Sequence, residues 1–152
     1  MKLDNIDLKI LNVIQSEGRI RTVELAERVG LSPTPCARRL RQMEEAGVIT
    51  GYRAMVDQTK LGFPITVFVS VELERKTAED LQNFEKAVQG FEEIVQGFIM
   101  TGSQDFMLRV VAADLLSFEQ FLQEKLGRVA GIRTTRSRFA LRSIIPAGRL
   151  PV

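Results

Sequence analysis

Hydrophobic residues recur every three or four positions in the first third of the chain, a spacing that predicts amphipathic helices. The third of these places Cys36, Leu40 and Met43 on one side. Each predicted helix lies between a residue suited to cap its start and a glycine suited to end it, namely Asp4 or Asn5 with Gly18, Thr22 with Gly30, and Ser32 with Gly47. A glycine-containing turn before a capped third helix predicts a helix-turn-helix.

From Ile65 onward hydrophobic and polar residues alternate, and this spacing of two predicts β-strands. Thr77 and Asp114 are expected to cap two intervening helices. The expected strands cover residues 65–73, 94–101, 106–112 and 132–145. This order predicts a ferredoxin-like βαββαβ domain, with both helices on one face of a four-stranded sheet. Residues 48–57 are expected to form a further, connecting strand.

The other face of the predicted sheet keeps large apolar residues that the helices cannot cover. Depending on strand register, Phe68, Phe98, Met100 or Met107 reaches this face. An uncovered, half-apolar surface indicates a protein partner. We therefore expect a dimer that packs through this face.

The third predicted helix carries a polar and basic side opposite its hydrophobic side. Arginine offers a forked donor to guanine, glutamine is a bidentate partner for adenine, and both reach phosphates. The residues expected to contact DNA are Thr34, Pro35, Arg38, Arg39, Arg41 and Gln42. Two alternatives stay open: the arginines form an ordinary solvated surface, or they belong to a protein-binding module of three helices.

Composition narrows the possible chemistry. The chain has 152 residues, no His, one Cys, and 21 Lys+Arg against 19 Asp+Glu. Without His there is no imidazole base and no His-bound metal, and a single Cys excludes an internal disulfide or a multi-cysteine site. We expect no enzymatic activity, no cofactor and no metal. Cys36 is expected to be a small core residue rather than a redox sensor.

The net charge of +2 hides an uneven distribution along the chain. Residues 63–131 carry an acidic excess, whereas residues 1–62 and 132–152 are basic. Residues 31–43 contain three arginines and no carboxylate, an electrostatic footprint of nucleic-acid binding. No apolar run approaches the roughly 18 residues of a membrane span, and the acidic start is unlike a signal peptide. We expect a cytoplasmic, nucleoid-associated protein.

The sequence resembles the Lrp/AsnC family of bacterial and archaeal feast/famine regulators in a continuous stretch over residues 23–52 and in two motifs, Leu3-Asp4-x-x-Asp7 and Ser32-Pro33-x-Pro35-Cys36. The resemblance implies an α+β fold in two domains. A winged helix-turn-helix DNA-binding domain (1–50) is followed by a hinge strand or linker (51–63). A ferredoxin-like regulatory (RAM) domain (64–152) would bind an effector and form dimers that assemble further, commonly to octamers.

Residues 102–106 resemble the family's Gly-x-x-Asp-(Tyr/Phe) turn, which lines an effector pocket between dimers. Asp105 could receive the ammonium of an amino acid, and arginines of the last strand could bind its carboxylate. Arginine there departs from the uncharged residues of a leucine-type pocket, so the effector stays open. The alternatives are an ordinary turn residue and a solvated or oligomer-contacting strand face. The expected effector-binding residues are Thr101, Gly102, Ser103, Asp105, Arg136 and Arg138.

We therefore expect a sequence-specific transcriptional regulator of amino-acid-related genes that responds to a small-molecule effector, an amino acid, bound at oligomer interfaces. Its partners would be double-stranded DNA, that effector and further copies of the chain. Two recognition helices of a dimer would enter successive major grooves about one helical turn apart. The alternative is a nucleoid-like architectural protein that binds DNA mainly through phosphates, and the ratio of specific to non-specific affinity distinguishes the two.

Overall fold

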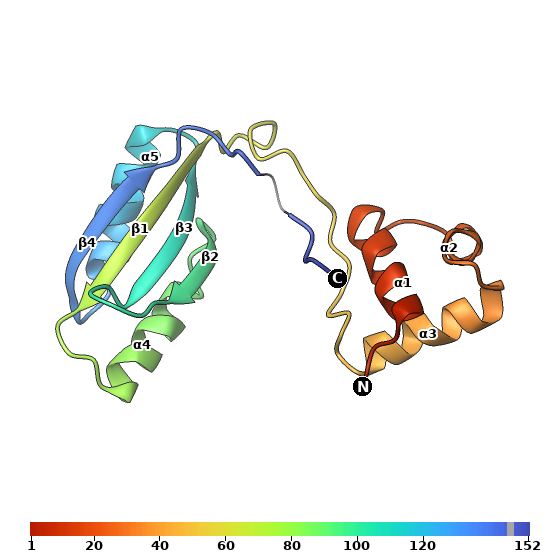
Figure 1. Cartoon of the computed structure of the whole chain (residues 1–152). Helices are drawn as coiled ribbons and strands as arrows, with labels where there is room; N and C mark the ends of the chain where they lie inside the picture. The colour runs from red at the N-terminus through yellow and green to blue at the C-terminus, as the bar shows by residue number, and fades with distance from the viewer. Residues whose placement is uncertain (146–147) are drawn as a thin grey trace. The chain divides into compact units, whose positions relative to one another are not determined.

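The structure is a computed structural model that describes residues 1–145 and 148–152. Contacts divide the chain into two compact units, Met1–Met55 with Ile145–Val152, and Val56–Ile144. The first unit holds three helices and the second a four-stranded sheet with helices on it, so the expected α+β fold is confirmed (Figure 1). Within the described residues, no helix has the length and hydrophobicity needed to cross a bilayer.

The helices of the first unit are α1 (Asn5–Ser16), α2 (Thr22–Val29) and α3 (Pro33–Glu45). Asp4 caps α1, because its side chain accepts hydrogen bonds from the backbone N–H groups of Ile6 and Asp7. Gly30 ends α2 in the left-handed conformation, with φ of 75°. The hydrophobic sides of the helices meet in one core, whose fully buried members include Ile10, Leu25, Ala26, Cys36 and Met43.

The second unit is the expected antiparallel sheet in the order β2-β3-β1-β4, formed by β1 (Ile65–Leu73), β2 (Ile94–Ile99), β3 (Phe106–Ala112) and β4 (Ile132–Phe139). Helices α4 (Ala78–Val88) and α5 (Leu115–Gln120) cover one face. Thr77 and Asp114 cap them as predicted. The core lies between this face and the helices, where the rings of Phe84 and Phe106 are 4.4 Å apart.

Three expected elements differ from the structure. Residues 48–57 form no strand in the described chain, where no neighbouring strand is present to pair with their backbone groups. The last strand ends at Phe139 rather than residue 145, because its partner β1 begins at Ile65 and offers no backbone beyond the hydrogen bond from Ala140 to Thr66. Strand β2 likewise ends at Ile99 rather than at residue 101.

Residues 145–152 cluster by their contacts with the first unit. The side-chain amide of Gln15 accepts a hydrogen bond from the Leu150 N–H at 2.7 Å and donates one to its carbonyl at 3.2 Å. Asn12 donates to the Val152 carbonyl, and Arg149 donates to the Ser16 hydroxyl, both at 2.8 Å. Residues 149–152 are therefore held along α1.

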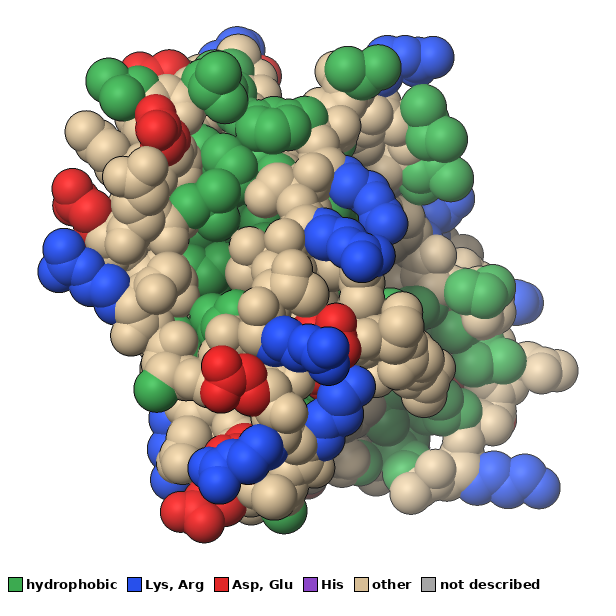
Figure 2. Space-filling view, turned by 90° about the vertical axis from the view of Figure 1, so that its left-hand side faces the viewer, with side chains coloured by type: hydrophobic (Ala, Val, Ile, Leu, Met, Phe, Trp, Pro, Cys, Tyr) green, Lys and Arg blue, Asp and Glu red, His purple; other side chains and the backbone are tan. Residues whose placement is uncertain are grey.

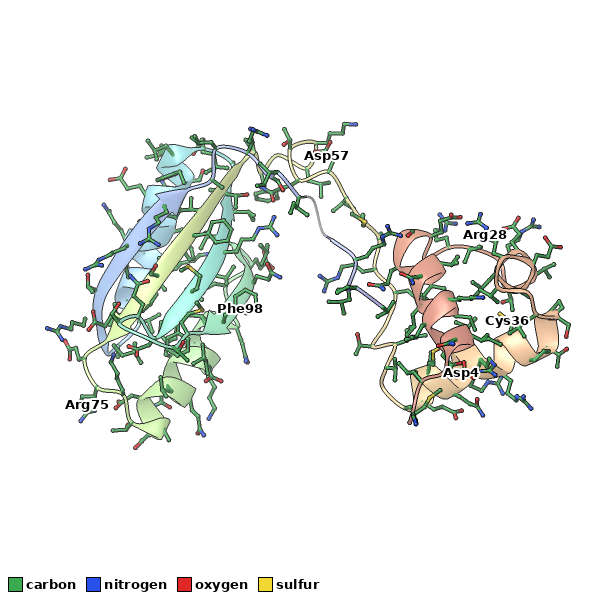
Figure 3. The ribbon with its side chains drawn as sticks, viewed as in Figure 1. Asp4, Arg28, Cys36, Asp57, Arg75 and Phe98 are labelled. Carbon is green, nitrogen blue, oxygen red and sulfur yellow. The ribbon has the colours of Figure 1, made fainter. Side chains whose placement is uncertain are left out.

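The face of the sheet opposite the helices is partly apolar, and no helix of the described chain covers it. At one end of this face Gln58 contacts Thr66 and Arg109. Phe68 on β1 lies between Arg138 of β4 and Arg109 of β3, and Phe98 of β2 pairs with Met107. Phe98 is 53% exposed and lies on the edge strand β2 (Figure 3). Hydrophobic side chains also reach the surface between charged ones elsewhere on the molecule (Figure 2). We call this opposite face of the sheet the open face.

Candidate nucleic-acid and effector sites

The outward side of α3 is the candidate DNA-contacting surface. Helix α3 begins after Ser32, with Pro33 at its first position. Proline is suited to this position because the N–H it lacks would have no hydrogen-bond partner within the helix. Cys36 and Met43 are buried, which turns the opposite side of the helix to solvent. Exposed there are Thr34, Arg38, Arg41 and Gln42, while Pro35 is half-buried.

The arginines of the first unit differ in what they contact. Arg21 pairs with Glu24, and Arg28 pairs with Glu17. Among the described residues, Arg38 and Arg41 have no hydrogen-bond or ion-pair partner. Their guanidinium groups are therefore available to an anion from outside the chain, such as a phosphate or the edge of a base.

Arg39 is different from its neighbours on α3, although the sequence grouped it with them. Its Nη1 donates to Asp4 Oδ2 at 2.7 Å and to Asp7 Oδ1 at 2.8 Å. The pKa of the Asp4 carboxyl is lowered, mainly by the hydrogen bond from the backbone N–H of Asp7 and next by the hydrogen bond from Arg39. The pKa of Arg39 is raised, mainly by its hydrogen bond to Asp7 and next by its hydrogen bond to Asp4. Asp4 marks the place where the start of α1 approaches α3 (Figure 3).

The last turn of α3 contacts the segment that follows it. The Tyr52 hydroxyl donates to Glu44 at 2.8 Å. Desolvation, with a smaller contribution from Glu44, raises the pKa of Tyr52 to about 12, so this hydroxyl keeps its proton at neutral pH. The contact ties the start of the connecting segment to the recognition-helix candidate.

Asp105 is nearly buried and already has partners within the chain. Its Oδ2 accepts the backbone N–H of Leu73 at 2.8 Å, and its Oδ1 lies 3.0 Å from Lys76 Nζ. The Asp105 N–H donates to Val71, and its carbonyl accepts from Met100. Asp105 thus anchors the β2–β3 turn to the end of β1, a role that differs from the expected free acceptor for an ammonium group.

The other expected effector residues lie in two places. Thr101, Gly102 and Ser103 are exposed in the β2–β3 turn, and Gly102 has a φ of 106° that favours glycine. Arg136 and Arg138 lie on the open face of β4, opposite Ser70 and Phe68. Strand β1 separates them from β3, which places the two backbones about 10 Å apart. The single chain does not bring these two groups together.

Two surface hollows of about 440 Å³ each lie elsewhere in the second unit. One is between α4 and β2 and is lined by Val88, Ile94, Phe98 and their neighbours. Neither contains an expected effector residue. In the part of the chain that the structure describes, no group of three or more acidic or cysteine side chains could hold a metal ion.

Sequence reasoning did not foresee the roles of Asp4 and Asp7 beside Arg39, or of Lys76 beside Asp105. The available signal was the Leu3-Asp4-x-x-Asp7 motif, whose two carboxylates lie one helical turn apart at the start of α1. Their arginine partner lies 32 and 35 positions away, and spacing along a sequence does not indicate such a pair.

Comparisons with known proteins cover both units. A family described as "Winged helix-turn-helix DNA-binding" matches residues 3–50, and one described as "Lrp/AsnC ligand binding domain" matches residues 66–150. The Bkd operon transcriptional regulator of Pseudomonas aeruginosa is 42% identical over 95% of this chain and 94% of that protein. The leucine-responsive regulatory protein of Escherichia coli K12 is 38% identical over 99% of this chain and 92% of that protein.

Solved structures agree with these matches. A transcriptional regulator of Neisseria meningitidis in complex with L-methionine superposes with a TM-score of 0.94 at 35% identity, covering 99% of this chain and 97% of that one. AsnC of E. coli has a TM-score of 0.89 at 25% identity, with 97% of each chain covered. The P. aeruginosa and N. meningitidis relatives are named as transcriptional regulators, and the E. coli K12 relative as a regulatory protein.

Proposed function

Because the chain belongs to the Lrp/AsnC family of transcriptional regulators, we propose that it reads specific double-stranded DNA sites with α3 and controls amino-acid-related genes. The observation that carries the proposal is the outward side of α3. It combines two arginines that lack partners in the described chain with Gln42 and Thr34, all exposed on one rigid helix. Side chains of these types recognise base edges and phosphates.

A dimer would double this surface. The open face of the sheet, with Phe68 and Phe98 exposed, supports pairing of two regulatory units. A symmetric dimer presents two copies of α3, and the expected binding site is a near-palindrome with half-sites about one helical turn apart. Further association to an octamer would add avidity to DNA binding.

We propose an amino acid as the effector, since a structural relative was solved with L-methionine. The exposed turn Thr101–Ser103 would supply backbone groups to the ligand, and Asp105 would hold this turn in shape. Arg136 and Arg138 are candidate donors to the ligand carboxylate from a neighbouring chain, because one chain keeps them apart from the turn. Binding between chains would let the effector alter assembly or DNA affinity.

The test of the DNA surface is substitution of its free arginines. Arg38→Ala and Arg41→Ala should each weaken binding to a duplex selected by the unmodified protein from a random library. We expect a loss of about fivefold or more, because a base contact is worth about 1–3 kcal/mol. Arg142→Ala, an exposed arginine of the other unit, is the matched control. Binding unchanged by both α3 substitutions in a fixed-salt mobility-shift assay would refute the assignment.

The effector is tested by thermal denaturation with each of the twenty amino acids. A ligand at about 100 times its dissociation constant should stabilise the protein by about 2.7 kcal/mol. Arg138→Gln should reduce that stabilisation, whereas Arg142→Gln should leave it intact. If no amino acid raises the melting temperature, the proposed effector class is wrong. An identical response of the Arg138→Gln variant would remove this arginine from the site.

A further inference from the structure

The interactions around Arg39 separate this residue from the arginines beside it on α3. We infer that Arg39 is a positioning residue, which fixes α3 against the start of α1 through Asp4 and Asp7 and thereby aims Arg38 and Arg41, without contacting DNA itself. This inference rests on the proposed function of α3. It assigns a role in DNA recognition to two acidic residues on a different helix.

The first argument is that both carboxylates are fully engaged. Asp4 Oδ1 accepts the N–H groups of Ile6 and Asp7 at 2.8 and 2.9 Å, and Asp4 Oδ2 accepts Arg39. Asp7 Oδ1 accepts Arg39, and Asp7 Oδ2 accepts the Asp4 N–H at 3.0 Å. One arginine nitrogen thus bridges two carboxylates that also form the N-terminal cap of α1. The carboxylates of Asp4 and Asp7 therefore cap α1 and, at the same time, bind Arg39 in the middle of α3.

Burial is the second argument. The Asp7 side chain is only 3% exposed, and the Arg39 side chain is 25% exposed. Turning Arg39 outward to a phosphate would leave the buried Asp7 carboxylate with its Asp4 N–H as the only remaining donor described here. Removing one partner from a buried pair costs far more than an exposed ion pair contributes. Arg39 is therefore held where it is when DNA arrives.

The third argument concerns charge. Arg39 brings one positive group to two carboxyl groups, so this cluster does not attract phosphate as Arg38 and Arg41 do. Arg39 lies between these two residues in the sequence of α3. A shift or rotation of α3 at Arg39 would move both of its exposed neighbours. A network that holds this point of the helix also sets where the two DNA-contacting side chains point.

Salt dependence distinguishes a positioning residue from a phosphate contact. Each phosphate contact contributes about 0.9 to the slope of log affinity against log salt concentration. The probe is the duplex selected by the unmodified protein, titrated at roughly 50 to 200 mM salt. Arg39→Gln should weaken binding about tenfold with an unchanged slope, and Arg38→Gln, as the matched control, should lower the slope. A lowered slope for Arg39→Gln would overturn the inference.

Substitution of Asp7, an acidic partner of Arg39, changes DNA affinity in opposite directions under the two roles of Arg39. If Arg39 positions α3, Asp7→Asn should weaken DNA binding, and combining it with Arg39→Gln should cause little further loss. If Arg39 instead binds phosphate, Asp7→Asn would release it and binding would stay the same or tighten. Additive losses in the double variant would also overturn the inference.

A second variant covers the case in which a change at the buried Asp7 unfolds the first unit. Asp4 is 52% exposed, and asparagine is as good a helix cap as aspartate, so Asp4→Asn removes the charge and keeps the cap. Circular dichroism establishes that the variant is folded. We expect weaker binding with an unchanged salt slope, and tighter binding would contradict the inference. If neither Arg38→Gln nor Arg41→Gln changes affinity or slope, α3 is not the DNA-reading helix, and the proposed function fails together with this inference.

Discussion

At the scale of single residues, burial decides what each reactive group can do. Cys36 is fully buried in the core of the first unit, among the hydrophobic sides of three helices. Burial raises the pKa of its thiol, so the neutral form persists at physiological pH. The sequence predicted a core residue from its spacing with Leu40 and Met43, and its burial confirms this.

We predict that the Cys36 thiol is inert in the folded protein. A thiol reagent such as 5,5′-dithiobis(2-nitrobenzoic acid) should react slowly with the native chain and rapidly after denaturation in guanidinium chloride. The physical reason is that the reactive thiolate is disfavoured and the sulfur is out of reach of solvent. Rapid, complete modification of the native protein would instead indicate a redox-accessible site. The absorbance released on reaction measures both rates.

Arg39 and Asp105 mark what residue-level reasoning missed. Both were expected to face a ligand, and both have partners inside the chain. Nothing in the local sequence distinguishes Arg39 from Arg38 or Arg41, since all three are arginines on one helix. The difference arises because α1 delivers two carboxylates to one side of α3.

At the scale of elements, hydrophobic spacing predicted each α-helix and β-strand of both units, with ends that differ by a few residues, but it also predicted a strand over residues 48–57 that the described chain does not form. The ends differ where they depend on a neighbour, as at the last strand, which stops where β1 offers no further backbone. The helix after Asp114 shows the same effect. Leu115 is apolar but 64% exposed, and the buried side of the helix begins at Phe118. The core lies against Phe118 and Phe121, not against the first turn.

The end of that helix shows a local constraint that spacing could not predict. After α5 the chain continues as a π turn over Phe121–Lys125 and a short 3-10 turn over Leu126–Arg128. A Cβ atom on Gly127 would lie 2.6 Å from the Leu122 carbonyl oxygen. A side chain at position 127 would clash with this carbonyl oxygen, so the backbone can adopt this tight turn only with glycine there.

At the scale of the whole molecule, the open face of the sheet is a surface on which a single chain exposes large hydrophobic side chains. Phe98 and Phe68 are exposed on it, and Phe68 lies beside Arg138. Burial of one phenylalanine contributes about 1.5–3 kcal/mol, and a symmetric dimer buries each residue twice. This face should therefore carry much of the energy of association.

We predict that Phe98→Lys weakens self-association by at least about tenfold in the dissociation constant, since tenfold corresponds to 1.4 kcal/mol. Analytical ultracentrifugation over a range of protein concentrations measures the change. Leu116→Lys is the control, because Leu116 is similarly exposed but lies on α5. An unmodified protein that stays monomeric would refute the proposed dimer. Equal effects of the two substitutions would show that the contact lies elsewhere.

The sequence by itself determined the order of the elements, the two-domain organisation, the family and the solvent-facing side of α3. These follow from periodicity, capping residues and short motifs, which act between residues close in the chain. Only the tertiary structure decided which arginine is free and which is paired, that Asp105 is anchored, and that residues 149–152 lie along α1. Each of these depends on partners 29 or more positions apart, and folding alone brings such partners within hydrogen-bonding distance.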